Sequence, residues 1–89
     1  MQQHHVEIIN RLGLHARAAA KFSTTASQYQ CQIKVQSQGK TVNGKSIMGL
    51  MMLAAARGTF IHIELDGADE NEALEALMAL IGNRFGEAE

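Results

Sequence analysis

The sequence predicts an α+β fold, an open-faced β-sandwich in which helices cover one face of an antiparallel sheet. Residues 30–37 and 60–66 alternate between apolar and polar side chains, so each is expected to form a strand with one dry face. Residues 15–27 and 70–85 repeat apolar side chains at the spacing of amphipathic helices. At 89 residues the chain is expected to be a single domain, 1–89. The predicted order is β-α-β-β-α-β-α, with three helices over a four-stranded sheet.

The first strand is expected at Val6–Ile9, where β-branched residues cluster, followed by a loop over 10–14. A helix then runs to about Ser27. Its core stripe combines small residues with one phenylalanine, which would let the helix lie close to the sheet: Ala19, Phe22, Ser23 and Ala26.

A hairpin is expected next. In residues 30–37 the side chains of Cys31, Ile33 and Val35 share one face, which also makes Cys31 a buried structural thiol. The turn 37–40 contains a glycine that can adopt positive φ, and Lys40–Asn43 forms the return strand.

Ser46 is placed to cap a second helix, Ile47 to about Ala56. The strand Phe60–Asp66 follows. Residues 69–72 have the form of a capping box, and they precede a long helix whose apolar side is Leu74, Leu77, Met78, Ile81 and Phe85. Periodicity does not determine the strand order, and a ferredoxin-like arrangement with an added helix fits the pattern equally well.

Composition argues against several functions. The net charge is −1, with one tyrosine and three phenylalanines, so nucleic-acid binding is not expected. No signal segment or apolar run long enough to span a bilayer is visible, and the single cysteine suits a reducing compartment, so a cytoplasmic protein without membrane insertion is expected. The histidines His4, His5 and His62 are interpreted as solvated, with no metal site and no cofactor.

The start of the first helix is the candidate site. None of the usual capping side chains precedes it, and unpaired N–H groups at a helix N-terminus favour an anion such as phosphate. Arg17 adds a cationic fork, and His15 adds an imidazole that is nucleophilic near neutral pH. The alternative is a surface histidine that lies near an arginine by chance. On the first interpretation, the helix is left without a side-chain cap because phosphate takes that place.

Two separated motifs, LGLHARAAAKF at 12–22 and NGKSIMGLMML at 43–53, closely resemble the HPr family, the histidine-containing phosphocarriers of the bacterial sugar phosphotransferase system. The resemblance extends from Val6 to about Phe85. It implies a sheet of strand order 1-4-2-3 and a monomeric carrier that is not an enzyme. Many members have proline where this chain has Ala18, a change that the first turn of a helix tolerates.

The resemblance also implies the site residues and partners. His15 matches the histidine that accepts phosphate from enzyme I and passes it to enzyme IIA domains. Arg17 matches the arginine beside it, with the backbone of Ala16, Arg17 and Ala18 binding phosphate. Ser46 matches a serine that HPr kinase/phosphorylase modifies in many bacteria. The implied partner surface comprises Ala20, Lys45, Ile47, Met48, Met51 and Met52.

The second helix carries more apolar residues than one core stripe needs, so part of it is expected to be exposed. One of its three methionines is expected in the core, with Met48 and Met51 outside. Two other functions stay open. One is a small acylphosphatase-like hydrolase; the other is the nitrogen-branch phosphocarrier, to which residues 81–86 (IGNRFG) are somewhat similar.

Overall fold

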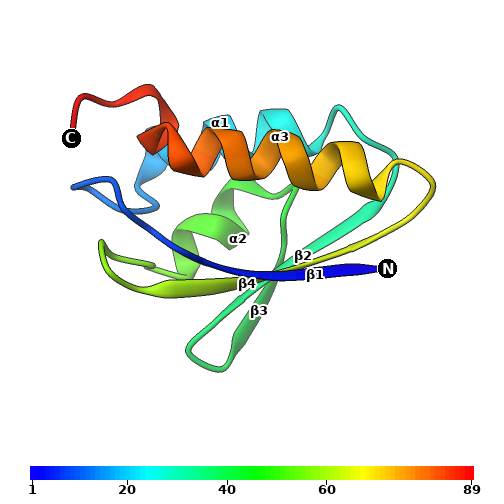
Figure 1. The fold of residues 1–89 in the computed structure, drawn as a ribbon. Helices are drawn as coiled ribbons and strands as arrows, with labels where there is room; N and C mark the ends of the chain where they lie inside the picture. Colours follow the sequence, from blue (N-terminus) through cyan, green and yellow to red (C-terminus); the bar gives the residue numbers. More distant parts are fainter.

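The computed structural model describes the whole chain, Met1–Glu89, as a four-stranded sheet with its helices on one face (Figure 1). The strands lie in the order β1-β4-β2-β3, and each neighbouring pair is antiparallel. This confirms the predicted class and strand order. The strands are β1 Gln2–Glu7, β2 Gln32–Ser37, β3 Lys40–Asn43 and β4 Phe60–Asp66.

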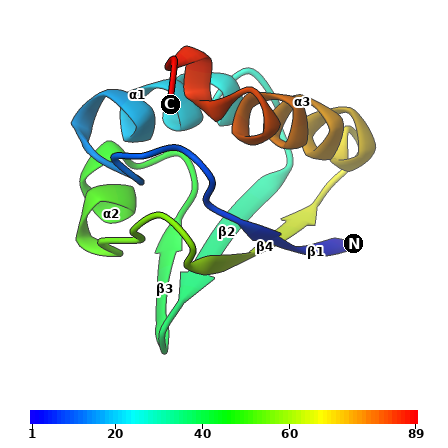
Figure 2. The same ribbon diagram turned by 60° about the vertical axis from the view of Figure 1, so that its left-hand side comes forward.

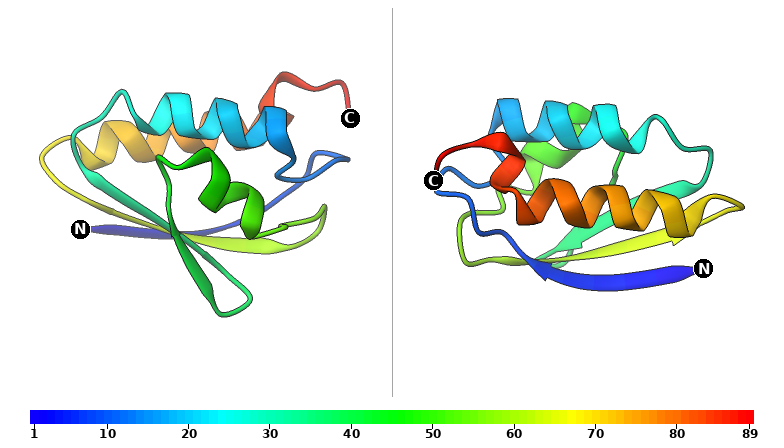
Figure 3. Two further views of the ribbon diagram at one scale, coloured as in Figure 1. Left: turned by 180° about the vertical axis from the view of Figure 1, so that it is seen from behind. Right: turned by 45° about the horizontal axis from the view of Figure 1, so that its top comes forward.

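The helices are α1 Ala16–Ala26, α2 Ile47–Met52 and α3 Glu70–Gly82, followed by a 3₁₀ turn, η1, at Arg84–Gly86. Figures 2 and 3 show α1 and α3 side by side above the sheet, and α1 also contacts the short α2. None of these helices has the length and apolar character needed to cross a membrane.

The core lies between the sheet and the helices, where the alternating strands place their apolar side chains. Ile33 and Val35 of β2 are buried, as are Ile61, Ile63 and Leu65 of β4. The predicted stripe of α1 is entirely buried, and so is Cys31. Because most of that stripe is small, α1 can approach the sheet closely.

The predicted first strand, Val6–Ile9, lies too late in the chain. β1 spans Gln2–Glu7 because β4 pairs with it along that length, and His5 lies opposite His62 with their ring centroids 4.4 Å apart. His4 and His5 therefore belong to an edge strand, and His62 is half-buried instead of solvated. The pattern is weak here because β1 has little burial on either face.

The second helix is shorter than predicted. It ends at Met52 instead of near Ala56, because Ala54 adopts a positive φ of 51°. The carbonyl of Ala55 then accepts the backbone N–H of Leu14 at 2.9 Å. A tertiary contact with the loop before α1 thus replaces the last helical turn.

The predicted capping box at 69–72 is wrong. Asp69 makes no side-chain cap; its carboxylate instead accepts the backbone N–H groups of Gln30 and Cys31, at 2.8 and 2.9 Å. The side chain of Glu70 accepts the N–H of Gly67 at 3.1 Å. Asp69 therefore ties the start of α3 to the start of β2.

Phe85 is buried as predicted, but it lies outside α3. The helix ends at Gly82, and Arg84 and Phe85 both have positive φ, near 54° and 55°. Such a conformation is unfavourable for a bulky residue, and burial of the aromatic ring offsets the strain. The reversal sends the C-terminal residues back toward the start of α1 (Figure 3).

Candidate functional site

His15 occupies the N-cap position of α1. Its backbone is extended (φ −79°, ψ −178°), and its carbonyl accepts the first helical bond, from Ala19 at 2.8 Å. Its own Nδ1 accepts the backbone N–H of Arg17 at 3.3 Å. The expectation that no side chain caps this helix is therefore wrong: the imidazole is the cap, over a long hydrogen bond that leaves Nδ1 facing the helix end.

The loop before His15 is held rigidly. Asn10 is fully buried and donates its side-chain amide to the carbonyl of Gly13 at 2.8 Å. Gly13 has φ +67° and packs so closely on the backbone of Ala55 and Ala56 that a Cβ there would lie 2.4 Å from the carbonyl oxygen of Ala55. The imidazole is thus positioned by a loop that has little freedom to move.

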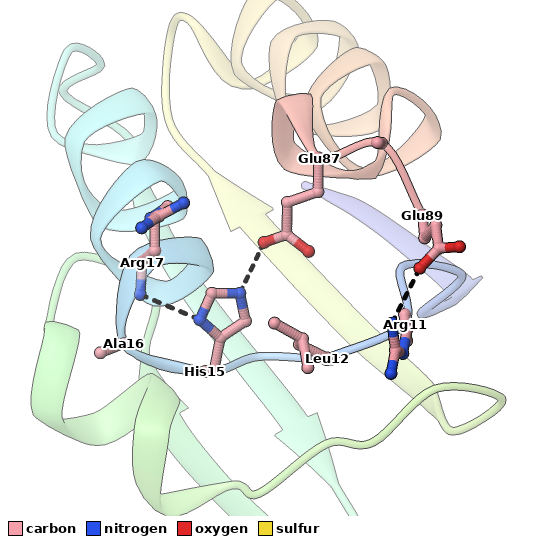
Figure 4. A pocket seen from close by; sticks show the side chains of 8 residues that line it. Arg11, Leu12, His15, Ala16, Arg17, Glu87 and Glu89 are labelled. Atoms are coloured by element: carbon pink, nitrogen blue, oxygen red, sulfur yellow. Dashed lines mark hydrogen bonds and ion pairs between the residues drawn. The ribbon is translucent and has the colours of Figure 1, made fainter.

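The C-terminal residues complete the site (Figure 4). Nε2 of His15 lies 2.5 Å from Oε2 of Glu87, while Oε1 of Glu87 accepts the amide of Asn10 at 3.1 Å. The side chains of His15 and Glu87 are only 28% and 13% exposed. Burial acts to raise the pKa of the Glu87 carboxyl, but the hydrogen bonds to His15 and Asn10 outweigh it and the pKa lies below its usual value.

The tail around Glu87 is tethered on both sides. Before it, the ammonium group of Lys21 donates to the carbonyl of Phe85 at 2.6 Å. After it, the backbone N–H of Arg11 donates to the carbonyl of Glu89, and the two side chains form an ion pair, each at 2.9 Å. The tail and the His15 loop enclose an open hollow of about 810 Å³.

Arg17 lies in the first turn of α1, where its backbone N–H donates to Nδ1 of His15 (Figure 4), and it lines the same hollow as the imidazole. Its exposed side chain makes no hydrogen bond within the protein. Ala16 is exposed and Ala18 buried, and their backbone N–H groups donate to no protein acceptor. A cation and unpaired donors therefore lie in the helical turn that Nδ1 faces, an arrangement suited to an anion there.

Ser46 caps α2 as predicted, and its hydroxyl accepts the N–H of Gly49 at 3.0 Å. Lys45 beside it is half-buried, and its ammonium donates to the carbonyl of Tyr29 at 2.6 Å, so this cation is not free. Ala20, the remaining member of the implied partner surface on α1, is half-buried.

The apolar residues of α2 form an exposed surface. Met48 and Met52 are 74% and 67% exposed, and Ile47 and Met51 are 43% exposed each. The expectation of one core methionine is wrong, because a helix of six residues presents one side chain fully to the core and Leu50 occupies that position.

Sequence reasoning missed Asn10 and Glu87. Neither takes part in a periodic pattern or a motif. Glu87 was visible only as an acidic residue after Gly86, and nothing local indicates that the tail returns to His15.

Comparisons with known proteins show the family to which this chain is similar. The family model described as "PTS HPr component phosphorylation site" matches residues 2–83. Phosphocarrier protein HPr of Neisseria meningitidis is 60% identical over the full length of both chains, and that of Cupriavidus necator is 54% identical, also over both full lengths. A solved HPr of Thermoanaerobacter tengcongensis superposes with a TM-score of 0.95 over all of both chains, at 46% identity. This chain therefore belongs to the HPr family, the phosphocarrier proteins of the phosphotransferase system.

Proposed function

We propose that His15 is the residue that carries the phosphoryl group, accepting it from phosphorylated enzyme I and passing it to enzyme IIA domains for sugar uptake. The observation that supports this proposal is the orientation of the imidazole, whose Nδ1 faces the N-terminus of α1. The Nδ1 lone pair forms the N–P bond while the bond between phosphorus and its donor atom breaks, and the donor keeps that electron pair.

The surroundings of Nδ1 suit the charge of the transferred group. The phosphoryl oxygens would accept hydrogen bonds from the backbone N–H groups of Ala16, Arg17 and Ala18. In the unphosphorylated protein the N–H of Arg17 donates to Nδ1, and the other two are unpaired. The guanidinium of Arg17 adds a mobile cation that can follow the phosphoryl group between donor and acceptor. Its role is to stabilise transferring charge rather than to hold the fold.

Partner docking is assigned to the α2 surface, formed by Ile47, Met48, Met51 and Met52, with Ala20 beside it on α1. Flexible methionines allow one surface to fit both enzyme I and several enzyme IIA domains. Lys45 would contribute to docking only after leaving the Tyr29 carbonyl.

Ser46 is proposed as the regulatory phosphorylation site for an HPr kinase/phosphorylase. Its hydroxyl already lies at a helix N-terminus, where added negative charge is tolerated, and it borders the α2 surface. Modification there would act on docking without rearranging His15.

Incubation with enzyme I and labelled phosphoenolpyruvate tests the central proposal. The chain should take up one acid-labile, base-stable phosphoryl group, mapped to His15, and His15→Ala should take up none. His62→Ala, which removes an imidazole from the open face of the sheet, should label normally. Full labelling of His15→Ala would refute the assignment.

The protein is proposed to be a carrier and not an enzyme. A hydrolase of acylphosphatase type would turn over acyl phosphate repeatedly, whereas a carrier stops after one phosphoryl group per chain. A multiple-turnover assay with acetyl phosphate separates these two functions, and sustained release of phosphate would favour the hydrolase.

We also propose that the chain is a monomer in the cytoplasm. A dimer is described for an HPr of Thermoanaerobacter tengcongensis, which is 47% identical, and a swapped dimer for Crh of Bacillus subtilis. Light scattering after size-exclusion chromatography should give the mass of one 9.7 kDa chain across micromolar concentrations. Twice that mass would overturn the monomer.

A further inference from the structure

We propose that Glu87 is a positioning residue for phosphoryl transfer: its carboxylate keeps the imidazole proton of His15 on Nε2 and thereby keeps the reactive lone pair on Nδ1. This inference rests on the proposed role of His15 as the phosphoryl acceptor. It concerns the tautomer and orientation of the ring, not the identity of the nucleophile.

The two contacts of the imidazole determine where its proton lies. A backbone N–H can only donate, so Nδ1 must accept from Arg17. An ionised carboxylate can only accept, so Nε2 must donate to Glu87. Both bonds form together only when the neutral ring carries its proton on Nε2, which is the tautomer whose Nδ1 can attack phosphorus.

Only a carboxylate satisfies both neighbours of Glu87. Oε2 faces the Nε2–H of His15, and Oε1 faces the side-chain amide of Asn10, which donates at 3.1 Å. Asn10 is oriented in turn by its 2.8 Å bond to the carbonyl of Gly13. A glutamine at position 87 could accept from one of these donors but would turn its own N–H₂ group toward the other.

The carboxylate also matches the charge that develops during transfer. When the lone pair of Nδ1 forms the N–P bond, the ring becomes positively charged and its Nε2 proton stays in the hydrogen bond to Glu87. Because Glu87 is mostly buried, water screens this interaction poorly. Glu87 therefore stabilises the charged ring during both uptake and release of the phosphoryl group.

The fold holds Glu87 in place from several directions. The backbone N–H of Glu87 donates to the carbonyl of Arg84 at 2.9 Å, in the reversal anchored by buried Phe85. The contacts of Lys21 and Arg11 fix the chain on either side of it. A carboxylate on a freely moving tail would not hold an imidazole in one orientation, whereas this one is restrained on both sides.

The first test is spectroscopic. Imidazole ¹⁵N shifts of His15 in the whole, unphosphorylated protein, measured at a pH where the ring is neutral, should give the signature of a proton fixed on Nε2. In Glu87→Ala both ¹⁵N shifts should move toward the averaged values of a ring that exchanges between its two tautomers. In Glu87→Gln the shifts should lie between those of Glu87→Ala and those of the wild type. Glu75→Gln removes the same charge from the exposed side of α3 and should change neither shift. Shifts in Glu87→Ala that equal those of the wild type would overturn the proposal.

The second test is kinetic. With enzyme I, Glu87→Ala should accept phosphate at a kcat/KM lower by about tenfold or more, the effect expected from loss of one charge-assisted hydrogen bond. Glu75→Gln should react like the wild type. Amide spectra that overlay outside residues near the tail establish that each variant is folded. A wild-type kcat/KM in folded Glu87→Ala would refute positioning.

The two proposals fail differently. If wild-type His15 were never labelled by enzyme I, the carrier assignment would fall, while the ¹⁵N shifts would still report whether Glu87 fixes the tautomer. If His15 were labelled and Glu87→Ala left both shifts and rate unchanged, only the role of Glu87 would fall.

Discussion

Leu14 donates its backbone N–H to the carbonyl oxygen of Ala55 at 2.9 Å, and this bond joins the loop that presents His15 to the segment after α2. The contact requires Gly13, because the two backbones approach too closely for a side chain. The start of α1, proposed to accept the phosphoryl group, and the proposed docking helix α2 are thereby tied to each other through the backbone.

Gly13→Ala should destabilise the protein by about 2 kcal/mol or more, because it adds a positive-φ penalty to a backbone clash. The clash is the 2.4 Å approach to the Ala55 oxygen. Gly39→Ala is the matched control: Gly39 also has positive φ, +82°, but nothing lies within 4 Å of its added Cβ. Gly39→Ala should therefore lower the free energy of unfolding by only about 1 kcal/mol. Urea unfolding measures both, and equal losses would show that the close approach at Gly13 carries no penalty.

The strands β2, β3 and β4 and most of the core could be predicted from the sequence because their signals are local, whereas β1 was misplaced because it lacks alternation. In β4, alternation over Phe60–Asp66 predicted both the bounds and the buried face. The stripe of α1 was equally clear. The end of α2 was not, because it depends on Ala55 meeting Leu14, a contact between residues far apart in the chain.

In the candidate site, too, residues within one local motif could be predicted, whereas a residue that arrives through a long-range contact could not. The proposed anion site at His15 and Arg17 could be suggested from residue types and from the resemblance, because both residues lie within one short motif. Glu87 is 72 residues away from His15 and reaches it only through the left-handed reversal at Arg84 and Phe85. Positive φ at bulky residues has no sequence signal, since it is imposed by burial of the aromatic ring.

Asp69 should make stability depend on acid pH. Its pKa lies below the usual value chiefly because its carboxylate accepts the backbone N–H of Gln30, and that of Cys31 as well. The folded state therefore binds this proton less readily than the unfolded state. Its contribution is complete above the ordinary carboxyl pKa of about 3.9 and is lost as pH falls through the lower folded value.

Asp69→Asn tests this expectation. The variant should have a lower Tm than the wild type at pH 7, and the two melting curves should converge as pH falls below about 4. Glu72→Gln, which removes a charge from an exposed side chain in the first turn of α3, should hardly change the Tm at pH 7. A Tm difference for Asp69→Asn that stays constant down to pH 2 would mean that the carboxylate charge is not what stabilises the contact.

Met48→Asp should weaken binding to enzyme I and to enzyme IIA together, because a charge placed in a shared apolar surface must lose its water against either partner. Stability should change by less than about 0.5 kcal/mol, since Met48 is 74% exposed. Phe60→Asp is the control: this side chain is 60% exposed, but it lies on the open face of the sheet. Titration calorimetry should give normal affinities for it. Normal affinity in Met48→Asp would remove Met48 from the docking surface.

Ser46→Asp should mimic the proposed regulatory phosphorylation by acting on docking alone. An aspartate can still accept the N–H of Gly49, as the serine hydroxyl does at 3.0 Å, and its charge is favoured at the start of α2, so the Tm should stay equal or rise. The same charge borders Ile47 and Met48 and would repel an acidic partner face. The Michaelis constant of enzyme I for this protein should therefore rise about tenfold or more.

Two controls, high salt and a neutral capping residue, separate charge repulsion from other causes of the raised Michaelis constant of Ser46→Asp. The defect of Ser46→Asp should shrink at 1 M salt, where the screening length falls to about 3 Å, because the repulsion acts across a solvated surface. Ser46→Asn keeps a capping oxygen of the same shape without the charge, so its Michaelis constant should match that of the serine protein. If Ser46→Asn were as defective as Ser46→Asp, the loss would come from the altered cap and not from charge. In that case Ser46 would act in this protein only as the N-cap of α2.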